Sequence, residues 1–278
     1  MSKFTTLVLS FINFFFKKLA IESLNKKLYL DHHNIYVKIN GTRYTFIYRS
    51  VDYDGLNMMC RENLKYWESS SREIFSILSL TSKCVVDIGS YTGVYTLVAA
   101  KTNKKILTIS FEPNPDLYVA LERNIKLNRL KNFKIEQLAL DKQIGSAVFY
   151  LNHDHNTSVG SLIKSSSAGT QIKVNRTTLD SYCQENRVDF IDLMKIDAEG
   201  CEINILEGSK VTLEKYSPLI LMEALTVSSL ESQYASLKQF GYLRPMQVKG
   251  DGFDNNNWLW FTKKNSARVD QVLHLLVV

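Results

Sequence analysis

Residues 85–96 read VVDIGSYTGVYT, and this stretch decides the fold. The apolar run before Asp87 is typical of a buried strand, and Gly89 and Gly93 allow a tight turn that approaches a ligand closely. The residues that follow, VYTLVAAK, can form a helix whose N-terminus favours an anionic group. The spacing is DxGxxxG, whereas dinucleotide folds use GxGxxG, and a carboxylate in the turn repels a pyrophosphate but accepts from an ammonium. The stretch therefore indicates a cofactor with both an ammonium and a carboxylate, as S-adenosylmethionine has.

A second apolar run supports this interpretation. Glycines alone are weak evidence, because a strand-to-helix connection needs them whether or not it binds a ligand. Residues 106–111 predict a strand that ends at Glu112, about 20 residues beyond the glycines, where a strand-end carboxylate meets ribose hydroxyls. Pro113 and Pro115 then end the strand and begin a helix over NPDLYVALERNIKLN. The sequence predicts two adjacent strand–helix units with Glu112 as the ribose ligand.

A later strand carries ionisable side chains to the edge of the predicted sheet. Residues 190–200, FIDLMKIDAEG, are apolar up to their charged end, and alternation puts Lys195, Asp197 and Glu199 on one side. A hydroxyl that accepts a methyl group must lose its proton, so Asp197 or Glu199 can act as base while Lys195 orients it or stabilises the oxyanion. Glu199 can alternatively cap the next helix, which is predicted over residues 202–216, together with Glu202. We predict Asp197, Glu199 and Lys195 as catalytic residues.

Five blocks of the chain resemble, in order, the FkbM-type S-adenosylmethionine-dependent methyltransferases. The blocks are VVDIGSYTGVYTLVAA, FEPNPDLYVALERNIKLN, ALDKQIG, TTLD and LMKIDAEGCEINILEG, within roughly residues 60 to 225. The DxEGxE pattern is the most specific, since many class I methyltransferases share the first two blocks. The resemblance implies an α/β, Rossmann-like class I fold with a seven-stranded, mostly parallel sheet and helices on both faces. It also implies methyl transfer, usually to an oxygen of a sugar, glycolipid or secondary metabolite.

The resemblance further implies where S-adenosylmethionine binds. Asp87, Gly89 and Gly93 would line the methionine end. Glu112 would hold the ribose, and a turn at residues 137–140 would face the adenine. The predicted cofactor ligands are Asp87, Gly89, Tyr91, Gly93, Glu112, Pro113, Asn114, Gln137, Leu138 and Ala139.

A polar loop between residues 152 and 170 offers two imidazoles. Loops of this composition often carry function. His153 and His155 form an HxH arrangement that suits contact with the acceptor, as a general base or as metal ligands, or else belongs to a solvated loop. No third metal ligand stands at a useful spacing beside these histidines. Asp197 and Glu199 could also ligate a divalent ion, but the sequence shows no clear set of three oxygen ligands, so we predict a reaction without metal.

Three further residues stand beside the predicted mouth of the site. Tyr66, Trp67 and Glu68 precede the first core strand, in a helix predicted over about residues 56–80. They can contact the acceptor, or they can simply pack. Residues 218–225, PLILMEAL, predict another strand that ends near Glu223 at the same sheet edge. The predicted acceptor contacts are His153, His155, Glu223 and Glu68.

The N-terminal residues 3–19 predict an amphipathic helix. Their apolar stretch is short for a bilayer span, which needs about 20 residues, and no small-residue cleavage site follows it. The helix can lie in the plane of a membrane surface, or it can pack on its own domain or on a partner subunit. Its polar stripe consists of Lys3, Thr6, Ser10, Asn13 and Lys17.

The charge distribution separates the extension from the rest of the chain. Residues 1–27 contain five lysines and one glutamate, whereas the whole chain has a net charge of +6. The excess suits anionic lipid headgroups or a basic solvated tail. The nearly balanced body lacks the basic cleft of a nucleic-acid enzyme, so we expect no nucleic-acid partner. We predict a cytoplasmic protein. The helix predicted at residues 3–19 also allows peripheral contact with the inner face of a membrane.

The composition fits one enzyme-sized globular domain with additions. Of 278 residues, 45% are hydrophobic and 22% are charged, as in ordinary soluble folds. The four cysteines are dispersed without a CxxC pair, which favours a reducing compartment. The predicted organisation is an amphipathic helix at 1–27, a cap of hairpin and helix at 28–80, the methyltransferase domain at 81–264, and a C-terminal tail at 265–278.

Two other classes of function stay open. A nucleic-acid or protein methyltransferase is disfavoured by the balanced charge and by the lack of an NPPY-type motif for a flipped amine. A catalytically inert, membrane-associated scaffold of the same fold is disfavoured by the intact Asp87, Gly89, Gly93 and Glu112.

Overall fold

The structure is a computed structural model that describes residues 33–39, 42–48, 68–152, 160–163, 168–249 and 256–277. The two predicted strands of the cap, β1 (His33–Ile39) and β2 (Thr42–Tyr48), pair antiparallel. Several predictions fall outside the described residues. These are the N-terminal helix, residues 56–67 of the cap helix, and the residues Tyr66, Trp67, His153 and His155. The described helix begins only at Ser69, and Glu68 is its N-cap with φ +44°, so the prediction that Glu68 lies within a helix is wrong.

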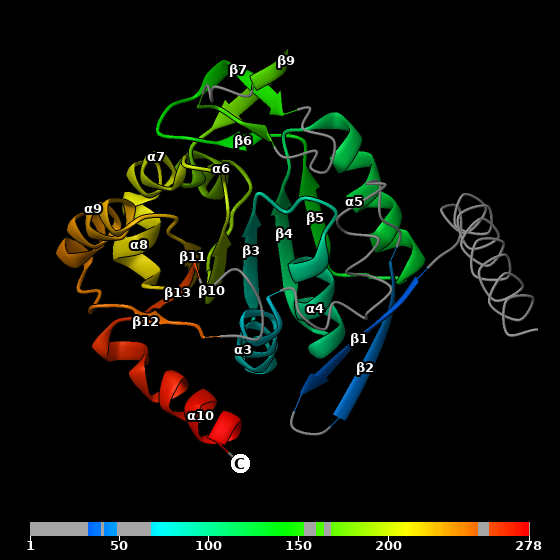
Figure 1. The fold of residues 1–278 in the computed structure, drawn as a ribbon, viewed down its shortest axis with the longest axis vertical. Coiled ribbons are helices and arrows are strands. Elements are labelled where there is room, and N and C mark those ends of the chain that lie inside the picture. The colour runs from blue at the N-terminus through cyan, green and yellow to red at the C-terminus, as the bar shows by residue number, and fades with distance from the viewer. Residues whose placement is uncertain are drawn as a thin grey trace, which may run out of the picture.

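A seven-stranded sheet forms the centre of the molecule, in the order β12-β13-β11-β10-β3-β4-β5 (Figure 1). Strand β13 pairs antiparallel with both of its neighbours, and the other pairs are parallel. The predicted class I fold is thereby confirmed. The strands are β3 (Cys84–Ile88), β4 (Leu107–Phe111), β5 (Phe133–Glu136), β10 (Leu193–Ile196), β11 (Leu219–Glu223), β12 (Met246–Gln247) and β13 (Asn257–Trp260).

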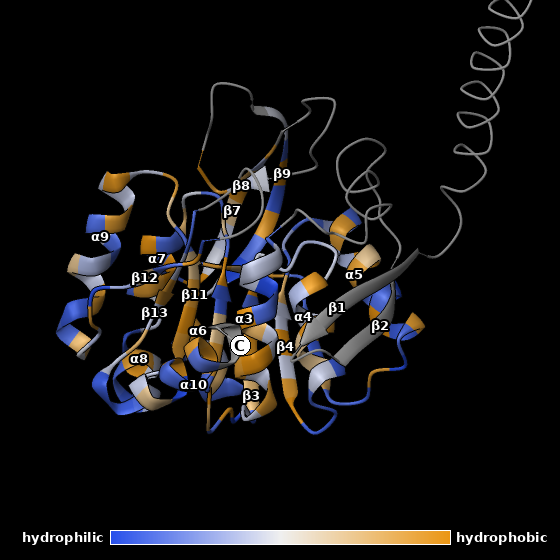
Figure 2. Ribbon diagram, turned by 60° about the horizontal axis from the view of Figure 1, so that its bottom comes forward, coloured by the Kyte–Doolittle hydropathy of each residue, from blue (hydrophilic) through white to orange (hydrophobic). Residues whose placement is uncertain are grey.

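Helices cover both faces of this sheet, because its central strands are apolar on both sides (Figure 2). In β3, Val85 belongs to the hydrophobic cluster that contains α3, α4 and α10, and Val86 belongs to the cluster that contains α6, α7 and α8. The helices are α3 (Ser69–Leu80), α4 (Val94–Thr102), α5 (Pro115–Leu127), α6 (Leu179–Glu185), α7 (Glu202–Glu207), α8 (Lys210–Tyr216), α9 (Val227–Leu237) and α10 (Ser266–Val277), with short 3-10 turns η1 (Lys238–Phe240) and η2 (Lys263–Asn265).

A second sheet of four strands was not expected from the sequence. It has the order β6-β9-β7-β8, with β6 (Ala139–Leu140), β7 (Gly145–Asn152), β8 (Gly160–Ser161) and β9 (Ala168–Thr177). Two predictions are therefore corrected. Residues 137–140 are only partly a turn, and the expected loop at 152–170 contains strand residues at both ends. The second sheet rises beside the carboxyl edge of the central sheet (Figure 1).

The predicted C-terminal tail is the helix α10. Val269 and Val272 are buried in the same cluster as α3, and Arg268 Nη2 donates to the carbonyl of Leu78 at 2.9 Å. The single helix expected after residue 201 is two helices, α7 and α8. They separate at Gly208, where a Cβ would lie 2.2 Å from the carbonyl oxygen of Asp141. Within the described parts of the chain, none of the helices combines the length and the apolar character needed to cross a membrane.

Candidate active site

The glycine turn after β3 presses against the end of β10. Gly89 has φ +73°, and a Cβ there would lie 1.7 Å from the carbonyl oxygen of Asp197. Gly93 has φ +93°, and its Cβ would lie 2.4 Å from Leu121 Cδ1. Both glycines are thus required by backbone conformation and by space. The turn brings the predicted cofactor residues into direct contact with a predicted catalytic residue.

Glu112 holds this turn from the end of β4. Its carboxylate, 4% exposed, accepts hydrogen bonds from Tyr91 N at 2.8 Å and from Asn114 N at 2.9 Å. Burial raises the pKa of Glu112 to about 8. Asn114 caps α5 by accepting from Asp116 N, and Pro113 links it to Glu112. The sequence placed Glu112 at this sheet edge correctly but did not indicate that it also fixes the backbone of Tyr91, which has φ +53°.

Asp87 lies within β3, not in the turn as expected. Its side chain is buried, and Oδ2 accepts from Thr96 N at 3.0 Å and from Thr96 Oγ1 at 2.6 Å. Burial raises its pKa to about 6. Asp87 therefore ties α4 to the strand, whatever further role it has toward a cofactor.

The residues predicted at the adenine divide between two environments. Gln137 is exposed and Leu138 is partly buried at the end of β5. Ala139 is 4% exposed and packs in a small cluster with Phe149 and Val174 of the second sheet. Of the three, Ala139 is thus the least accessible to a ligand.

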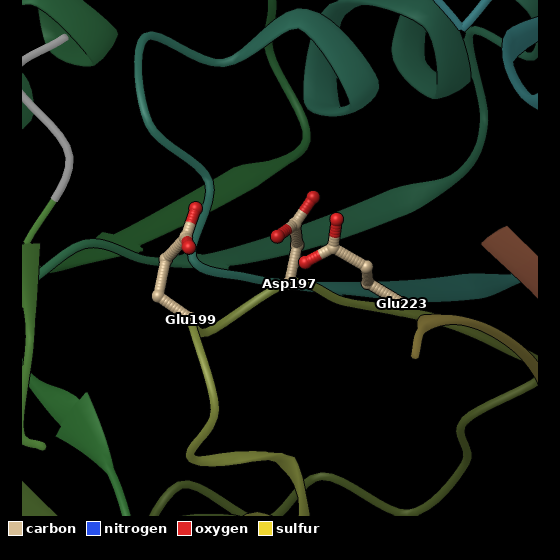
Figure 3. Close-up of side chains that lie close together, drawn as sticks. All are labelled: Asp197, Glu199 and Glu223. Carbon is tan, nitrogen blue, oxygen red and sulfur yellow. The ribbon is translucent and has the colours of Figure 1, made fainter. Parts of the chain in front are cut away.

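Three carboxyl groups converge at the carboxyl edge of the central sheet. One oxygen each of Asp197, Glu199 and Glu223 lies within 4.8 Å of the others, and Asp197 stands between the two glutamates (Figure 3). Hard divalent cations prefer such oxygen donors. The prediction that Asp197 and Glu199 have no third oxygen ligand beside them is therefore wrong. The sequence placed Glu223 at the same sheet edge but could not show that its carboxylate comes within reach of the other two.

The electrostatics of this cluster depend on Lys195. Its ammonium is 1% exposed and donates to Asp197 Oδ2 at 2.9 Å. Burial lowers the pKa of Lys195, but the Asp197 and Glu68 carboxylates outweigh burial and raise it above its usual value. Burial, with Asp197 nearby, raises the pKa of Glu199 to about 7 and that of Glu223 to about 9. The cluster thus holds protons readily at neutral pH.

Glu199 is not the cap of α7. The N-cap residue is Cys201, and Glu202 in the first turn holds the loop before the helix, since its Oε1 accepts from Ala198 N at 3.0 Å and from Gly200 N at 3.1 Å. Glu199 itself has φ +52°, and its carbonyl accepts from Ser161 Oγ of β8 at 2.8 Å. The second sheet is thereby joined to the turn that carries the carboxylates.

Glu68 lies near the cluster, but its carboxylate is occupied by the protein itself. It accepts from Tyr95 OH at 2.5 Å and from Asn257 Nδ2 at 2.9 Å. Neither partner was predicted from the sequence. Asn257 stands at the start of an apolar strand near the end of the chain, and Tyr95 reads as an ordinary helix residue, so neither carries a local signal.

Known proteins resemble this chain in sequence and in fold. The profile of the Methyltransferase FkbM domain matches residues 87–247, more than half of the chain. The chain is 22% identical to Methyltransferase 1 of Beauveria bassiana over 45% of this chain and 57% of that protein. It is 24% identical to the 2-O-methyltransferase NoeI of Sinorhizobium fredii over 52% of this chain and 64% of that protein. The match thus spans less than two thirds of either relative.

A solved structure is also similar. It is that of Methyltransferase FkbM from Methylobacillus flagellatus, with a TM-score of 0.47 at 13% identity, covering 74% of this chain and 60% of that one.

Proposed function

Because the chain belongs to the FkbM methyltransferase family, we propose that it transfers a methyl group from S-adenosylmethionine to a hydroxyl oxygen of a sugar, glycolipid or secondary metabolite. The contact of Gly89 with the carbonyl of Asp197 carries this proposal. It joins the glycine turn after β3 to the cluster of carboxyl groups. Methyl transfer needs a cofactor site and a proton acceptor side by side.

The residues of the turn fit the proposed cofactor. A Cβ at Gly89 would meet the backbone of Asp197 and a Cβ at Gly93 would meet Leu121, so both glycines let the turn pack tightly at the edge where the cofactor is proposed to bind. Each carboxylate oxygen of Glu112 accepts one backbone N–H and keeps a second lone pair, which can accept from a ribose hydroxyl. When bound, S-adenosylmethionine would supply an electrophilic methyl group at this edge. The chain's part is to orient the two substrates and to exclude water.

The carboxyl cluster would handle the proton of the acceptor. Asp197 is held by Lys195 and faces Glu199 and Glu223, so a hydroxyl at this place can donate to a carboxylate as it attacks. A cluster of acidic groups disfavours a polyanionic acceptor, which supports a neutral hydroxyl compound over a nucleic acid. A membrane-bound acceptor remains part of the proposal through the sequence of residues 3–19.

Cofactor binding is the first test. We expect calorimetric titration of S-adenosylmethionine into the wild type to show binding that Asp87→Ala and Glu112→Ala each weaken by about 10- to 100-fold, the effect of losing a hydrogen bond to a charged group. Asp180→Ala is the matched control, because Asp180 also accepts from two backbone N–H groups, those of Val211 and Thr212, on the opposite face. No binding to a folded wild type would reject the proposal.

The pH dependence of transfer gives a second test. Glu199, with a pKa of about 7, becomes negatively charged only above that pH, and its charge beside Asp197 then strengthens Asp197 as the proton acceptor. We therefore expect kcat/KM to rise with pH and level off above about 8, with about a tenfold loss at pH 6. Glu199→Gln should lower kcat/KM and flatten its rise with pH. Glu207→Gln, at an exposed position, should leave both unchanged. An unchanged rise in Glu199→Gln would assign it to another group.

We also propose that the reaction needs no metal ion. Lys195 already provides a positive charge to Asp197, and the raised pKa values of Glu199 and Glu223 reduce the negative charge of the cluster. Transfer of the tritiated methyl group of S-adenosylmethionine, measured against a panel of sugars and glycolipids, should be equal with and without EDTA. Turnover that EDTA abolishes and magnesium restores would instead assign a cation to the three carboxyl groups.

A further inference from the structure

The ammonium of Lys195 is enclosed on three sides. It donates to Asp197 Oδ2 at 2.9 Å and to Asn257 Oδ1 at 3.1 Å, and it lies 5.1 Å from the centroid of the Tyr95 ring. Lys195 is 1% and Asn257 is 2% exposed. A lysine ammonium has three N–H groups. A carboxylate, an amide oxygen and an aromatic face account for all three directions.

The same partners are joined to one another through Glu68. Asn257 Nδ2 donates to Glu68 Oε1 at 2.9 Å, and Tyr95 OH donates to Glu68 Oε2 at 2.5 Å. Lys195, Asn257, Glu68 and Tyr95 therefore form a closed ring, which we call the lysine ring. Its members come from β10, β13, the start of α3 and α4, so four elements fix one ammonium.

The lysine ring lies between the glycine turn after β3 and the carboxyl cluster. In the sheet, Lys195 is the register partner of Asp87 on β3, and Asn257 is the register partner of Glu223 on β11. A shift of the ammonium would disturb Asp197, which is its partner in the carboxyl cluster and touches Gly89 of the turn. The sequence suggested that Lys195 could stabilise an oxyanion directly. Its occupied N–H groups favour a different role.

We propose that Asn257, Glu68 and Tyr95 are positioning residues that hold Lys195 against Asp197, and that Glu68 does not contact the acceptor. The proposal rests on the proposed function, in which Asp197 faces the acceptor hydroxyl. The ring keeps the cation fixed, so that Asp197 is oriented before the acceptor arrives. Orientation within a fraction of an ångström is what such supporting residues contribute to a reaction.

Nuclear magnetic resonance of the full chain labelled with ¹⁵N-lysine tests the ring without any acceptor. Ammonium protons of exposed lysines exchange with water too quickly to be seen at neutral pH, whereas a buried, hydrogen-bonded ammonium exchanges only on opening. We expect one such signal with a cross-peak to the Tyr95 ring protons. Asn257→Leu should broaden it beyond detection. Asn175→Leu, the same change at an exposed position of β9, should leave it intact. Absence of this signal from folded wild-type protein would show that the lysine ring does not form.

Kinetics separate positioning from contact with the acceptor. With an acceptor found in the panel above, Asn257→Leu and Glu68→Leu should lower kcat by about 10- to 100-fold while KM for S-adenosylmethionine changes little. Glu68→Gln should lose much less of kcat than Glu68→Leu and should keep the acceptor KM, because a glutamine amide can still accept from Asn257 and can donate to the Tyr95 oxygen, although it removes one of the carboxylates that raise the pKa of Lys195. An Asn257→Leu enzyme with wild-type kcat, or a Glu68→Gln enzyme with a raised acceptor KM, would overturn the assignment.

The two proposals fail in different ways. A folded wild type that shows the ammonium signal but binds no S-adenosylmethionine would remove the proposed function, and the positioning role with it. Methyl transfer without the ammonium signal would keep the function and remove the ring. Circular dichroism and thermal melting of each variant confirm that a lost signal or a lower rate reflects the ring and not unfolding.

Discussion

We expect Gly89→Ala to destabilise the fold by about 3–5 kcal/mol and to abolish binding of S-adenosylmethionine, which is a large effect for one added methyl group. The new Cβ would lie 1.7 Å from the carbonyl oxygen and 2.8 Å from the carbonyl carbon of Asp197. Both atoms are backbone, so no side chain can rotate away. The chain must either move β10 or open the turn. In each case the contact between the turn and Asp197 is lost. Thermal melting should show a Tm lower by roughly 10 °C.

The matched control for this variant is Gly241→Ala. Gly241 has φ +82°, close to that of Gly89, but a Cβ there meets nothing within 4 Å. It therefore isolates the cost of the left-handed backbone conformation, about 1–2 kcal/mol. Equal melting temperatures for Gly89→Ala and Gly241→Ala would mean that the turn adapts to the added Cβ at little cost in stability. The close approach of Gly89 to Asp197 would then not explain how the site is assembled.

The strands that are buried on both faces of the sheet were predicted correctly from the sequence. Strands such as β3, β4 and β10 lie between two layers of helices, so they appear as unbroken apolar runs that end in a charged residue. The same rule placed Asp197 and Glu223 at one edge, since parallel strands end together. These predictions need only local pattern and the geometry of a parallel sheet.

Long-range pairing explains what the sequence did not predict. Strand β9 has partly exposed, alternating residues and gains its partner β7 only in the folded chain. Asn257 is 62 residues from Lys195 and 189 from Glu68 along the chain, so no local pattern links them. The motif singled out Asp87 but could not show that its carboxylate accepts hydrogen bonds from Thr96.

Asp197→Asn should lower methyl transfer by about 1,000-fold or more, within the range for loss of a general base, while the affinity for S-adenosylmethionine stays within about threefold. The amide cannot accept the acceptor's proton, although its oxygen can still accept from Lys195. Removal of the negative charge leaves the buried ammonium less well compensated, at a cost on the order of 3 kcal/mol. The assay is therefore run well below the Tm of the variant, and cofactor binding is measured by calorimetry in the same buffer.

Asp192→Asn is the control for the loss of one carboxylate beside β10. Asp192 precedes the strand at its opposite end, where Oδ2 accepts from Cys84 N at 3.0 Å. This change should lower stability without a specific effect on transfer, because the residue lies far from the carboxyl cluster. Equal losses of activity in the two variants would indicate that Asp197 acts only through the fold. A rate in Asp197→Asn close to the wild type would instead leave Glu199 or Glu223 as the proton acceptor. The contact with Gly89 would then only hold β10 in position, and the proton would be accepted by one of the two glutamates.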